Sequence, residues 1–485
     1  MRYIALLLFS VVLRAADDPG EALAEQLKKI VDVFATVEQE AADPVSANQA
    51  FYQGAIPAML RTLDPHSIFF DPDQFQQLQQ MEKSESKGFG TIVSIVPGRV
   101  IILQAIEGSP SAKAGLGAGD EILAINGIAL SQLEPEQLVQ LLSQARQQMV
   151  VMDVRKPGNA RLFRFSLTPE LVDTPSVDRA FKIAPGIGYL RIKGFEGPTG
   201  KLVKDTIEKL GGANLKGLII DLRDNPGGVV QSAVETASLF LKPDQLVFTV
   251  KGRTEQQQEV RVPKLGEPYT FPVALLMDGK SASASEILAG ALQDHDRATI
   301  LGEPSYGKGL VQNVFPLSSN SGLALTIAFY YTPSGRSIQK PLSSGSLDIA
   351  AKATPGVFHT DAGREVRGGG GIQPDELAAP APLTRLQVVL DGTGALTTFA
   401  GEYVQTHDIK DGFDVTPQIL DQLQVFLSER NIRPGVGDWL RDRDLIQSKL
   451  KQEIFNLKFG VAQGDEIEMR RDPVVQGALK ALGRR

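Results

Sequence analysis

Cysteine is absent from this chain of 485 residues, and histidine occurs only four times. Without cysteine, no disulfide can form. The histidines show no spacing of the His-x-x-x-His kind that binds metal ions; they are His66, His295, His359 and His407. We therefore expect neither a metal nor any other cofactor.

Aromatic residues are also scarce, at 6% of the chain, and no cluster of basic residues occurs. Proteins that bind nucleic acids are typically basic, and many stack bases on aromatic side chains. The formal net charge of −7 favours solubility and says little about partners. Nucleic acid is therefore not an expected partner.

Long apolar runs are missing too. The apolar run at the N-terminus, Ile4 to Leu13, has ten residues and is too short to span a bilayer. Arg2 precedes it, and Arg14 and two alanines follow it, which is typical of a secretory signal peptide over residues 1–16. We expect an exported protein, periplasmic or extracellular, that stays anchored in the membrane only if the signal is not cleaved.

The length indicates about three domains at ~150 residues each. Residues 17–85 begin with a helical pattern, because apolar residues recur at spacings of four and three from Leu23 to Val37. The dipeptide Asp43-Pro44 ends this helix, and Ser46 caps the next one, which runs toward Leu63. The apolar stripe either packs on its own domain or pairs two subunits in a homodimer, and the pattern does not distinguish the two.

From about residue 171 the pattern alternates between strands and helices, which predicts an α/β fold. The expected strands are Ile187–Ile192, Leu218–Leu222, Val273–Met277 and Ala298–Leu301, and the expected helices are 201–210, 230–240 and 284–293. Residues 342–371 are rich in Ser and Gly and predict an exposed loop. Helices follow a linker at Ala378–Pro382; one is predicted to be capped by Thr416 and another by Asp438. These C-terminal helices form a homodimer arm, a partner-docking module or an inert packing domain, and the pattern does not distinguish the three.

Ser283 is the candidate nucleophile. It lies in a run of small residues, Ser281–Ala284, between the apolar strand Val273–Met277 and the helix predicted at 284–293. Such a turn exposes a hydroxyl beside helix N-terminal amides that have no partner within the helix. A serine placed there can attack a carbonyl, and the amides can hold the resulting oxyanion.

A hydroxyl needs a base, and Lys308 is the candidate. A lysine acts as a base at neutral pH only where burial lowers its pKa. Gln312 follows four residues later, and positions i and i+4 face the same side of a strand. Gln312 is therefore placed to orient the amine of Lys308.

Other nucleophile systems fit less well. His295 is predicted about three helical turns from Ser283, some ~18 Å away, which is too far for a Ser-His pair. Two Ser-x-x-Lys matches, Ser84 with Lys87 and Ser337 with Lys340, lack the apolar helix that this motif needs.

Five segments together resemble the C-terminal processing peptidases, also called tail-specific proteases. They occur in the expected order and cover about residues 60 to 376; they are Asp64–Ser67, Asp221–Gly228, Ser283–Gln312, Tyr331–Ile338 and Gly371–Asp375. Each segment alone is a moderate signal, whereas the ordered set is specific. The resemblance implies a Ser-Lys serine endopeptidase with a crotonase-like core at residues 171–376.

Carried over by position, the resemblance makes Ser283 the nucleophile, Lys308 the general base and Gln312 the residue that orients the lysine. It also implies an oxyanion hole made by the amide of Ala284 and one amide from Gly227 or Gly228.

Residues 86–170 resemble a PDZ domain. Its carboxylate-binding loop would comprise Gly88, Phe89, Gly90 and Thr91, and a helix is expected to begin near Pro135. Loop amides can hold a terminal carboxylate while a strand edge pairs with the extended peptide. Phe89 departs from the commoner aliphatic residue, so the tail pocket is expected to be narrow.

These expectations combine into an inserted PDZ domain, a protease core, and helical regions at residues 17–85 and 377–485. The predicted activity is cleavage of proteins near unstructured C-terminal tails. The alternative is a binder on the same fold that holds peptides or apolar ligands without catalysis. The intact set of Ser283, Lys308 and Gln312 favours the enzyme.

Overall fold

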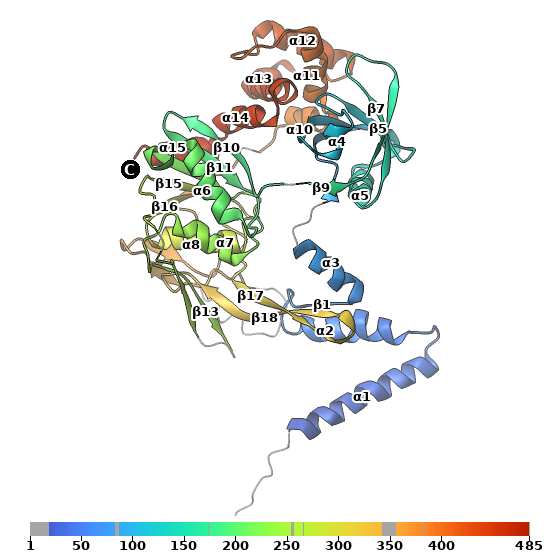
Figure 1. The fold of residues 1–485 in the computed structure, drawn as a ribbon, viewed down its shortest axis with the longest axis vertical. Coiled ribbons are helices and arrows are strands. Elements are labelled where there is room, and N and C mark those ends of the chain that lie inside the picture. Colours follow the sequence, from blue (N-terminus) through green and yellow to red (C-terminus); the bar gives the residue numbers. More distant parts are fainter. Residues whose placement is uncertain are drawn as a thin grey trace, which may run out of the picture. The chain divides into compact units, whose positions relative to one another are not determined.

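The computed structural model describes most of the chain, and its elements are drawn in Figure 1. The described residues are 19–82, 87–172, 174–253, 257–264, 266–341, 356–380 and 382–484. The predicted signal peptide, Ser84 and much of the predicted loop at 342–371 lie outside them. The chain divides into two units, of which the first comprises residues up to Phe75 with Val314–Leu325 and the second nearly all of the remainder.

The first unit begins with the predicted helix. Helix α1 (Pro19–Glu40) contains the apolar stripe and ends before Asp43, and the next helical segment combines η1 (Gln49–Ala55) with α2 (Ile56–Arg61). Leu23 of α1 is 60% exposed and Ile30 48% exposed. Only the stripe's middle is covered, where the Phe34 ring lies 5.1 Å from that of Phe51.

The Asp64–Ser67 segment of this unit forms a tight turn. The buried carboxylate of Asp64 accepts hydrogen bonds from the amides of His66 and Ser67 and from the Ser67 hydroxyl. Strand β1 (Ile68–Phe70) follows and pairs antiparallel with the start of β18 (Gly322–Tyr331). His66 thus belongs to a turn.

The second unit contains a small antiparallel sheet with the order β3-β4-β5-β7-β8. The strands are β3 (Thr91–Val96), β4 (Arg99–Ala105), β5 (Glu121–Ile125), β7 (Val150–Arg155) and β8 (Leu162–Leu167). The helix predicted near Pro135 is α5 (Pro135–Ala145), and it packs on the sheet through Leu138. Strand β3 is an edge strand, so its outer side has no neighbour in this sheet.

The main sheet has the order β10-β11-β12-β15-β16-β21, parallel except at β10. Its strands are β10 (Val177–Ala184), β11 (Ile187–Ile192), β12 (Gly217–Asp221), β15 (Val273–Met277), β16 (Ala298–Gly302) and β21 (Glu376–Leu377). Every strand predicted between residues 171 and 301 is present within a residue of its expected bounds. The predicted α/β fold is confirmed, whereas its crotonase-like character stays a prediction.

Helices cover both faces of this sheet. One face packs against α6 (Thr199–Leu210), α7 (Val230–Ser238) and α8 (Ala284–Asp294) around buried residues such as Leu288. The other face packs against α15 (Pro473–Leu482) through Val474, Val475 and Ala478. Figure 1 shows α15 beside β15 and β16. The last helix of the chain is therefore part of the layered core.

A second sheet contains β13 (Leu246–Gly252), β14 (Gln258–Arg261) and β17 (Leu310–Pro316), with β18 between β13 and β1. β15 is apolar throughout, and β12 is apolar up to its last residue, Asp221, as expected where both faces are covered. The small-residue turn after β15 and the loop after β16 leave the main sheet at its carboxyl edge, which is where ligands bind in open α/β sheets.

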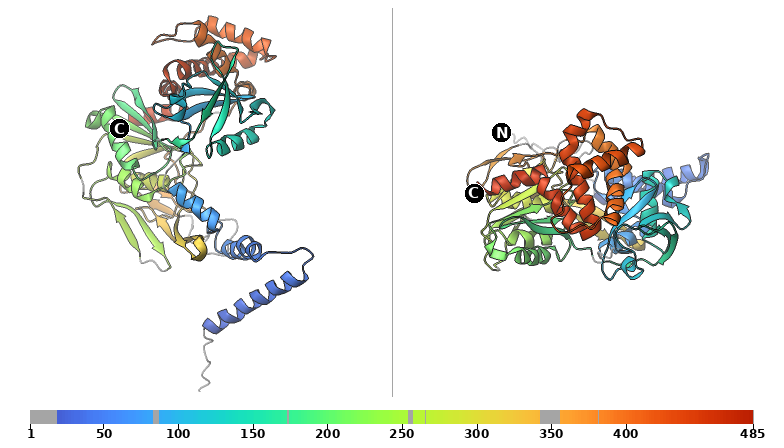
Figure 2. Two further views of the ribbon diagram at one scale, coloured as in Figure 1. Left: turned by 45° about the vertical axis from the view of Figure 1, so that its right-hand side comes forward. Right: turned by 90° about the horizontal axis from the view of Figure 1, so that it is seen from above.

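The C-terminal helices are α10 (Arg385–Thr393), α11 (Ala395–Thr406), α12 (Pro417–Glu429), α13 (Val436–Phe459) and α14 (Val461–Arg471), followed by α15; the views in Figure 2 draw them in orange and red. Thr416 occupies the N-cap position of α12, as predicted. The prediction that Asp438 caps a helix is wrong, because α13 already begins after Gly435. Pro434 restricts the residue before it to extended backbone, so the helix can begin only after that residue. The helix then starts at Val436, two residues after the proline.

Candidate active site

Ser283 occupies the N-cap position of α8, on the sharp turn between β15 and the helix. Its backbone angles are φ 54° and ψ −112°, a strained conformation for a residue that is not glycine. Such strain persists only where the surroundings fix it, and it is common at functional sites. The side chain is half-buried, whereas Ala282 and Ala284 on either side are buried.

The loop after β12 holds the serine turn in place. Asn225 is fully buried, and its carbonyl accepts hydrogen bonds from the amide of Ala282 (3.0 Å) and the hydroxyl of Ser285 (3.1 Å). The Ser281 hydroxyl donates to the carbonyl of Leu222 at 2.8 Å. The loop and the serine turn therefore form one hydrogen-bonded unit.

Gly227 brings this loop against the nucleophile. A Cβ atom on Gly227 would lie 2.9 Å from the Cβ of Ser283 and 2.9 Å from the amide nitrogen of Ala284, so only glycine fits. The Gly227 amide donates to the Asn225 side chain at 2.8 Å and is not available to an oxyanion. Within the described ranges, the amides of Gly228 and Ala284 donate to no acceptor. The oxyanion hole predicted from Ala284 and one of the two glycines stays a prediction.

Glu286 joins the serine turn to the lysine loop. One carboxylate oxygen of Glu286 accepts both the amide of Ser283 (2.8 Å) and the amide of Lys308 (2.9 Å). The other accepts the hydroxyl of Ser305 (2.5 Å) and the amide of Gly307 (2.7 Å). Because the Ser283 and Lys308 amides share one oxygen, the two segments are neighbours although 25 residues separate them.

The electrostatics of Glu286 follow from its surroundings. The residue is fully buried, and burial raises the pKa of its carboxyl above the ordinary value. The four hydrogen bonds act in the opposite direction, because each of them favours the charged form. All four partners are donors, so only the ionised carboxylate accepts every one of them.

Lys308 stands two residues before β17 and is half-buried. In the part of the chain that the structure describes, no hydrogen bond or ion pair engages its amine. The loop around it is fixed from the far side by Lys340, whose amine donates to the carbonyl of Ser305 at 2.8 Å and whose amide donates to that of Gly307 at 3.0 Å. The free amine thus extends from a rigid loop.

Gln312 lies in β17 and is half-buried. It is four residues beyond Lys308, which itself lies outside the strand, so strand alternation does not determine how the two side chains face. The predicted role of Gln312 in orienting the lysine stays a prediction.

His295 is at the opposite end of α8 from Ser283, as expected. It bonds with Asp361 (2.7 Å) and with the carbonyl of Leu246 (2.8 Å). The same helix end carries Asp294, which pairs with the fully buried Arg336 at 2.8 Å. The Tyr331–Ile338 segment therefore anchors the helix that carries Ser283 on its first turn.

The predicted carboxylate loop lies at one end of a groove between β3 and α5. The groove has a volume of about 170 Å³, and its lining includes Gly88, Phe89, Gly90, Thr91, Leu142, Ala145 and Met152. The side chain of Phe89 is only 8% exposed and packs in the domain core. Among the described residues, the amides of Phe89 and Gly90 donate to no acceptor.

Sequence reasoning missed the positioning role of three residues, Asn225, Glu286 and Ser305. Each lies inside a recognised segment, and Glu286 stands three positions after Ser283, the spacing of a capping box. That spacing predicts the bond to the Ser283 amide. It does not predict the bonds to the lysine loop, which require that the chain return from β16.

No group of His, Asp and Glu side chains within the described ranges is arranged to hold a metal ion. Within the same ranges, no helix is both long enough and apolar enough to cross a membrane.

Comparison with known proteins shows which family the chain resembles. The model of peptidase family S41 matches residues 186–345, and a PDZ domain model matches residues 101–156. A carboxy-terminal-processing protease of Bartonella bacilliformis is 35% identical over 320 residues, which cover 65% of this chain and 73% of that protein. A carboxyl-terminal-processing protease of Synechocystis is 36% identical over 293 residues, covering 59% and 68%.

A third relative, the carboxy-terminal processing protease CtpB of Bacillus subtilis, is 30% identical over 328 residues, or 67% of each chain. These matches define the protein as a serine peptidase with a PDZ domain. The chain belongs to peptidase family S41, among the carboxy-terminal processing proteases.

Proposed function

We propose that this peptidase is exported and cleaves proteins near unstructured C-terminal tails through Ser283 and Lys308. The observation that carries the proposal is the Glu286 carboxylate, which holds the backbones of both residues through a single oxygen. The Lys308 amine, which has no partner among the described residues, and the strained turn at Ser283 support the same assignment.

The proposed reaction begins when the Ser283 hydroxyl attacks a peptide carbonyl and its proton passes to Lys308. The oxyanion accepts hydrogen bonds from the amides of Ala284 and Gly228. The intermediate then collapses, the C–N bond breaks, and Lys308 returns the proton to the leaving amine. Water hydrolyses the acyl-enzyme, with Lys308 acting as base again.

Ser283→Ala is expected to abolish cleavage, because the neighbouring hydroxyls of Ser281 and Ser285 are engaged with backbone carbonyls. The measurement is mass spectrometry of a disordered protein incubated with each enzyme. Ser143→Ala, at an exposed position of α5, is the control for loss of a hydroxyl outside the site. New peptides formed equally by wild type and Ser283→Ala would show that Ser283 does not carry the reaction.

The PDZ groove is proposed to receive the substrate's terminal carboxylate. The amides of Phe89 and Gly90 are placed to bind it, and the free edge of β3 can pair with the extended tail. Ile92 and Ile95 of β3 are 39% and 48% exposed, so part of this strand is apolar and accessible. The small volume of the groove suits a small apolar terminal residue.

A peptide that ends in a free carboxylate should be cleaved faster than its amidated twin. A charge-assisted hydrogen bond contributes about 1.5–3 kcal/mol, so the loss of one should weaken capture about tenfold or more. The measurement is the initial rate for both peptides at concentrations well below saturation.

Gly90→Ala should remove this preference, because Gly90 has φ +71° and its Cβ would lie 2.2 Å from that of Ser109. Gly98→Ala is the matched control: Gly98 has φ +78° in the same domain, but its Cβ would meet nothing closer than 3.4 Å. If both peptides are cleaved equally fast by wild type, this groove does not read the carboxylate. A preference that survives in Gly90→Ala would assign the reading to the protease cleft.

The exported location and the subunit pairing remain proposals that rest on the sequence and on α1. Its apolar residues Leu23, Leu27 and Ile30 are exposed, which suits a homodimer formed through this helix. N-terminal sequencing of protein recovered from the periplasm or medium tests the signal, and light scattering tests the dimer.

A further inference from the structure

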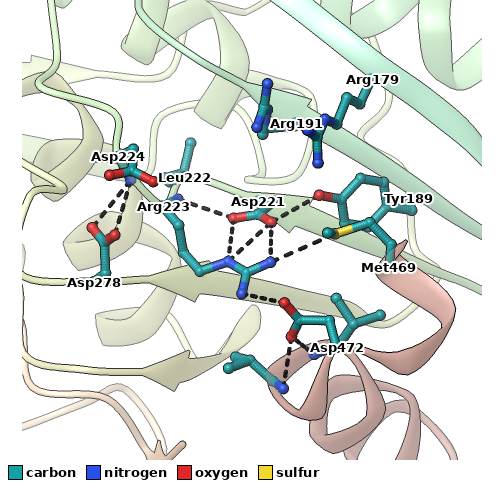
Figure 3. Close-up of polar contacts among 12 residues, drawn as sticks. Arg179, Tyr189, Arg191, Asp221, Leu222, Arg223, Asp224, Asp278, Met469 and Asp472 are labelled. Carbon is teal, nitrogen blue, oxygen red and sulfur yellow. Dashed lines mark hydrogen bonds and ion pairs between the residues drawn. The ribbon is translucent and has the colours of Figure 1, made fainter. Parts of the chain in front are cut away.

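The base of the oxyanion loop contacts the far C-terminal end of the chain. Arg223 stands at the start of the loop that leads to Gly228, and its guanidinium lies between two carboxylates (Figure 3). Nε and Nη2 donate to Asp221 at 3.0 and 2.6 Å, and Nη1 donates to Asp472 at 2.7 Å. Arg223 and Asp472, which are 249 positions apart in the sequence, are thus in contact at the start of the loop that leads to Gly228.

We propose that Asp472 is a positioning residue for catalysis, which acts through Arg223 on the loop that carries the Gly228 amide. This inference rests on the proposed function, because it assumes that Gly228 stabilises the oxyanion. It makes the α14–α15 junction a part of the catalytic apparatus.

Asp472 is itself held rigidly. It ends α14 and is the N-cap of α15, and its Oδ1 accepts the amides of Val474 (2.8 Å) and Val475 (3.0 Å). Those two valines are buried against the main sheet. The other oxygen, Oδ2, is thereby directed at Arg223. The carboxylate divides its two oxygens between the helix and the loop.

Arg223 passes this constraint on to the loop. Asp221, which binds its other side, is buried and also accepts the hydroxyl of Tyr189 at 2.8 Å. The next residue, Asp224, donates its amide to Asp278 at the end of β15, and Asn225 then binds the serine turn. From Arg223 to Gly228 the chain is six residues long, so a shift at its start reaches the amide.

The charges at this point are balanced as a set. The side chains of Arg223 and Asp472 are each 15% exposed. Burial alone would lower the pKa of Arg223, but the two carboxylates outweigh it and raise that pKa. Removal of the Asp472 charge leaves Asp221 as the only carboxylate in contact with the guanidinium within the described ranges, and the guanidinium is then free to move.

Asp472→Asn separates this role from helix capping. Asparagine caps helices about as well as aspartate, so the bonds to Val474 and Val475 are retained. Its amide group meets Arg223 donor to donor, so the ion pair is lost. Asp391→Asn is the matched control, because Asp391 pairs with Lys449 within the C-terminal helices and touches no part of the loop.

Asp472→Asn should lower kcat about tenfold with an unchanged KM, because displacement of an oxyanion donor weakens transition-state binding alone. A peptide aldehyde probes the hole directly: the Ser283 hydroxyl adds to its carbonyl, the proton passes to Lys308 or to the adduct, and no group leaves. Its Ki should rise by the same factor as kcat falls. The Ki of the corresponding alcohol, which forms no adduct, should not change.

The pairing with Arg223 is tested by a double variant. If Asp472 acts through Arg223, then Arg223→Met with Asp472→Asn should cost no more kcat than Arg223→Met alone. A purely structural role for Asp472 predicts a lower melting temperature with full kcat at 25 °C. That result, additive losses in the double variant, or an equal loss in Asp391→Asn would overturn the proposal.

Failure of the proposed function would look different. If wild type and Ser283→Ala cleave alike, or if the aldehyde and alcohol bind wild type equally well, the site itself is misassigned. If wild type discriminates between the two inhibitors and Asp472→Asn does so to the same degree, only the inference about Asp472 fails.

Discussion

Lys308→Arg should abolish peptide cleavage although the positive charge is kept. Arginine does not lose its proton in proteins, so it cannot accept one from the Ser283 hydroxyl. General-base catalysis contributes about 10²- to 10⁴-fold to a rate, and turnover should fall by at least that factor. The measurement is kcat for a peptide substrate over a range of pH.

A control variant tests whether the loss is specific to this lysine. Lys280→Arg is the matched control, because Lys280 lies just before the serine turn, is 78% exposed and pairs with Asp224. Full activity in Lys308→Arg, or an equal loss in Lys280→Arg, would show that Lys308 is not the base.

The sequence predicts the elements that position Ser283 because they are local features. The strand Val273–Met277 agrees residue for residue, and α8 begins at the position predicted for it. An apolar run followed by small residues and a second apolar period contains all the information that this turn needs.

The hydrogen bonds and packing contacts between distant segments are not predictable in this way. Nothing in the sequence distinguishes the amides of Gly227 and Gly228. Only the folded loop shows that the Gly227 amide donates to the Asn225 side chain. Likewise, the pattern at residues 377–485 indicates helices without indicating where they pack. That α15 covers the second face of the main sheet depends on buried contacts such as Val475 with the core, which are set by tertiary structure.

Glu286→Gln should reduce kcat about as severely as loss of a catalytic group. Glutamine keeps one acceptor oxygen and replaces the other with an amide that donates. In one orientation the new NH2 group points at the donors of Ser305 and Gly307. In the other orientation it points at the amides of Ser283 and Lys308. Two hydrogen bonds are lost in either case. In both orientations the serine turn and the lysine loop lose their common anchor, and a misplacement of about 1 Å can cost about 10²-fold in rate.

The sign of the stability effect distinguishes this role from simple packing. Because burial raises the pKa of Glu286, its ionisation disfavours folding, and this cost grows as pH rises from the ordinary carboxyl pKa through the raised one. Glutamine carries no such cost, so Glu286→Gln should lose less stability relative to wild type at neutral pH than at acid pH, while kcat stays low throughout. Thermal melts and kcat at each pH measure the two separately. Glu303→Gln, an exposed carboxylate on the same loop, serves as the control and should match wild type. The carboxylate of Glu286 is costly to ionise but accepts four hydrogen bonds, so we infer that its role is to hold Ser283 beside Lys308. A Glu286→Gln enzyme with normal kcat would refute that role.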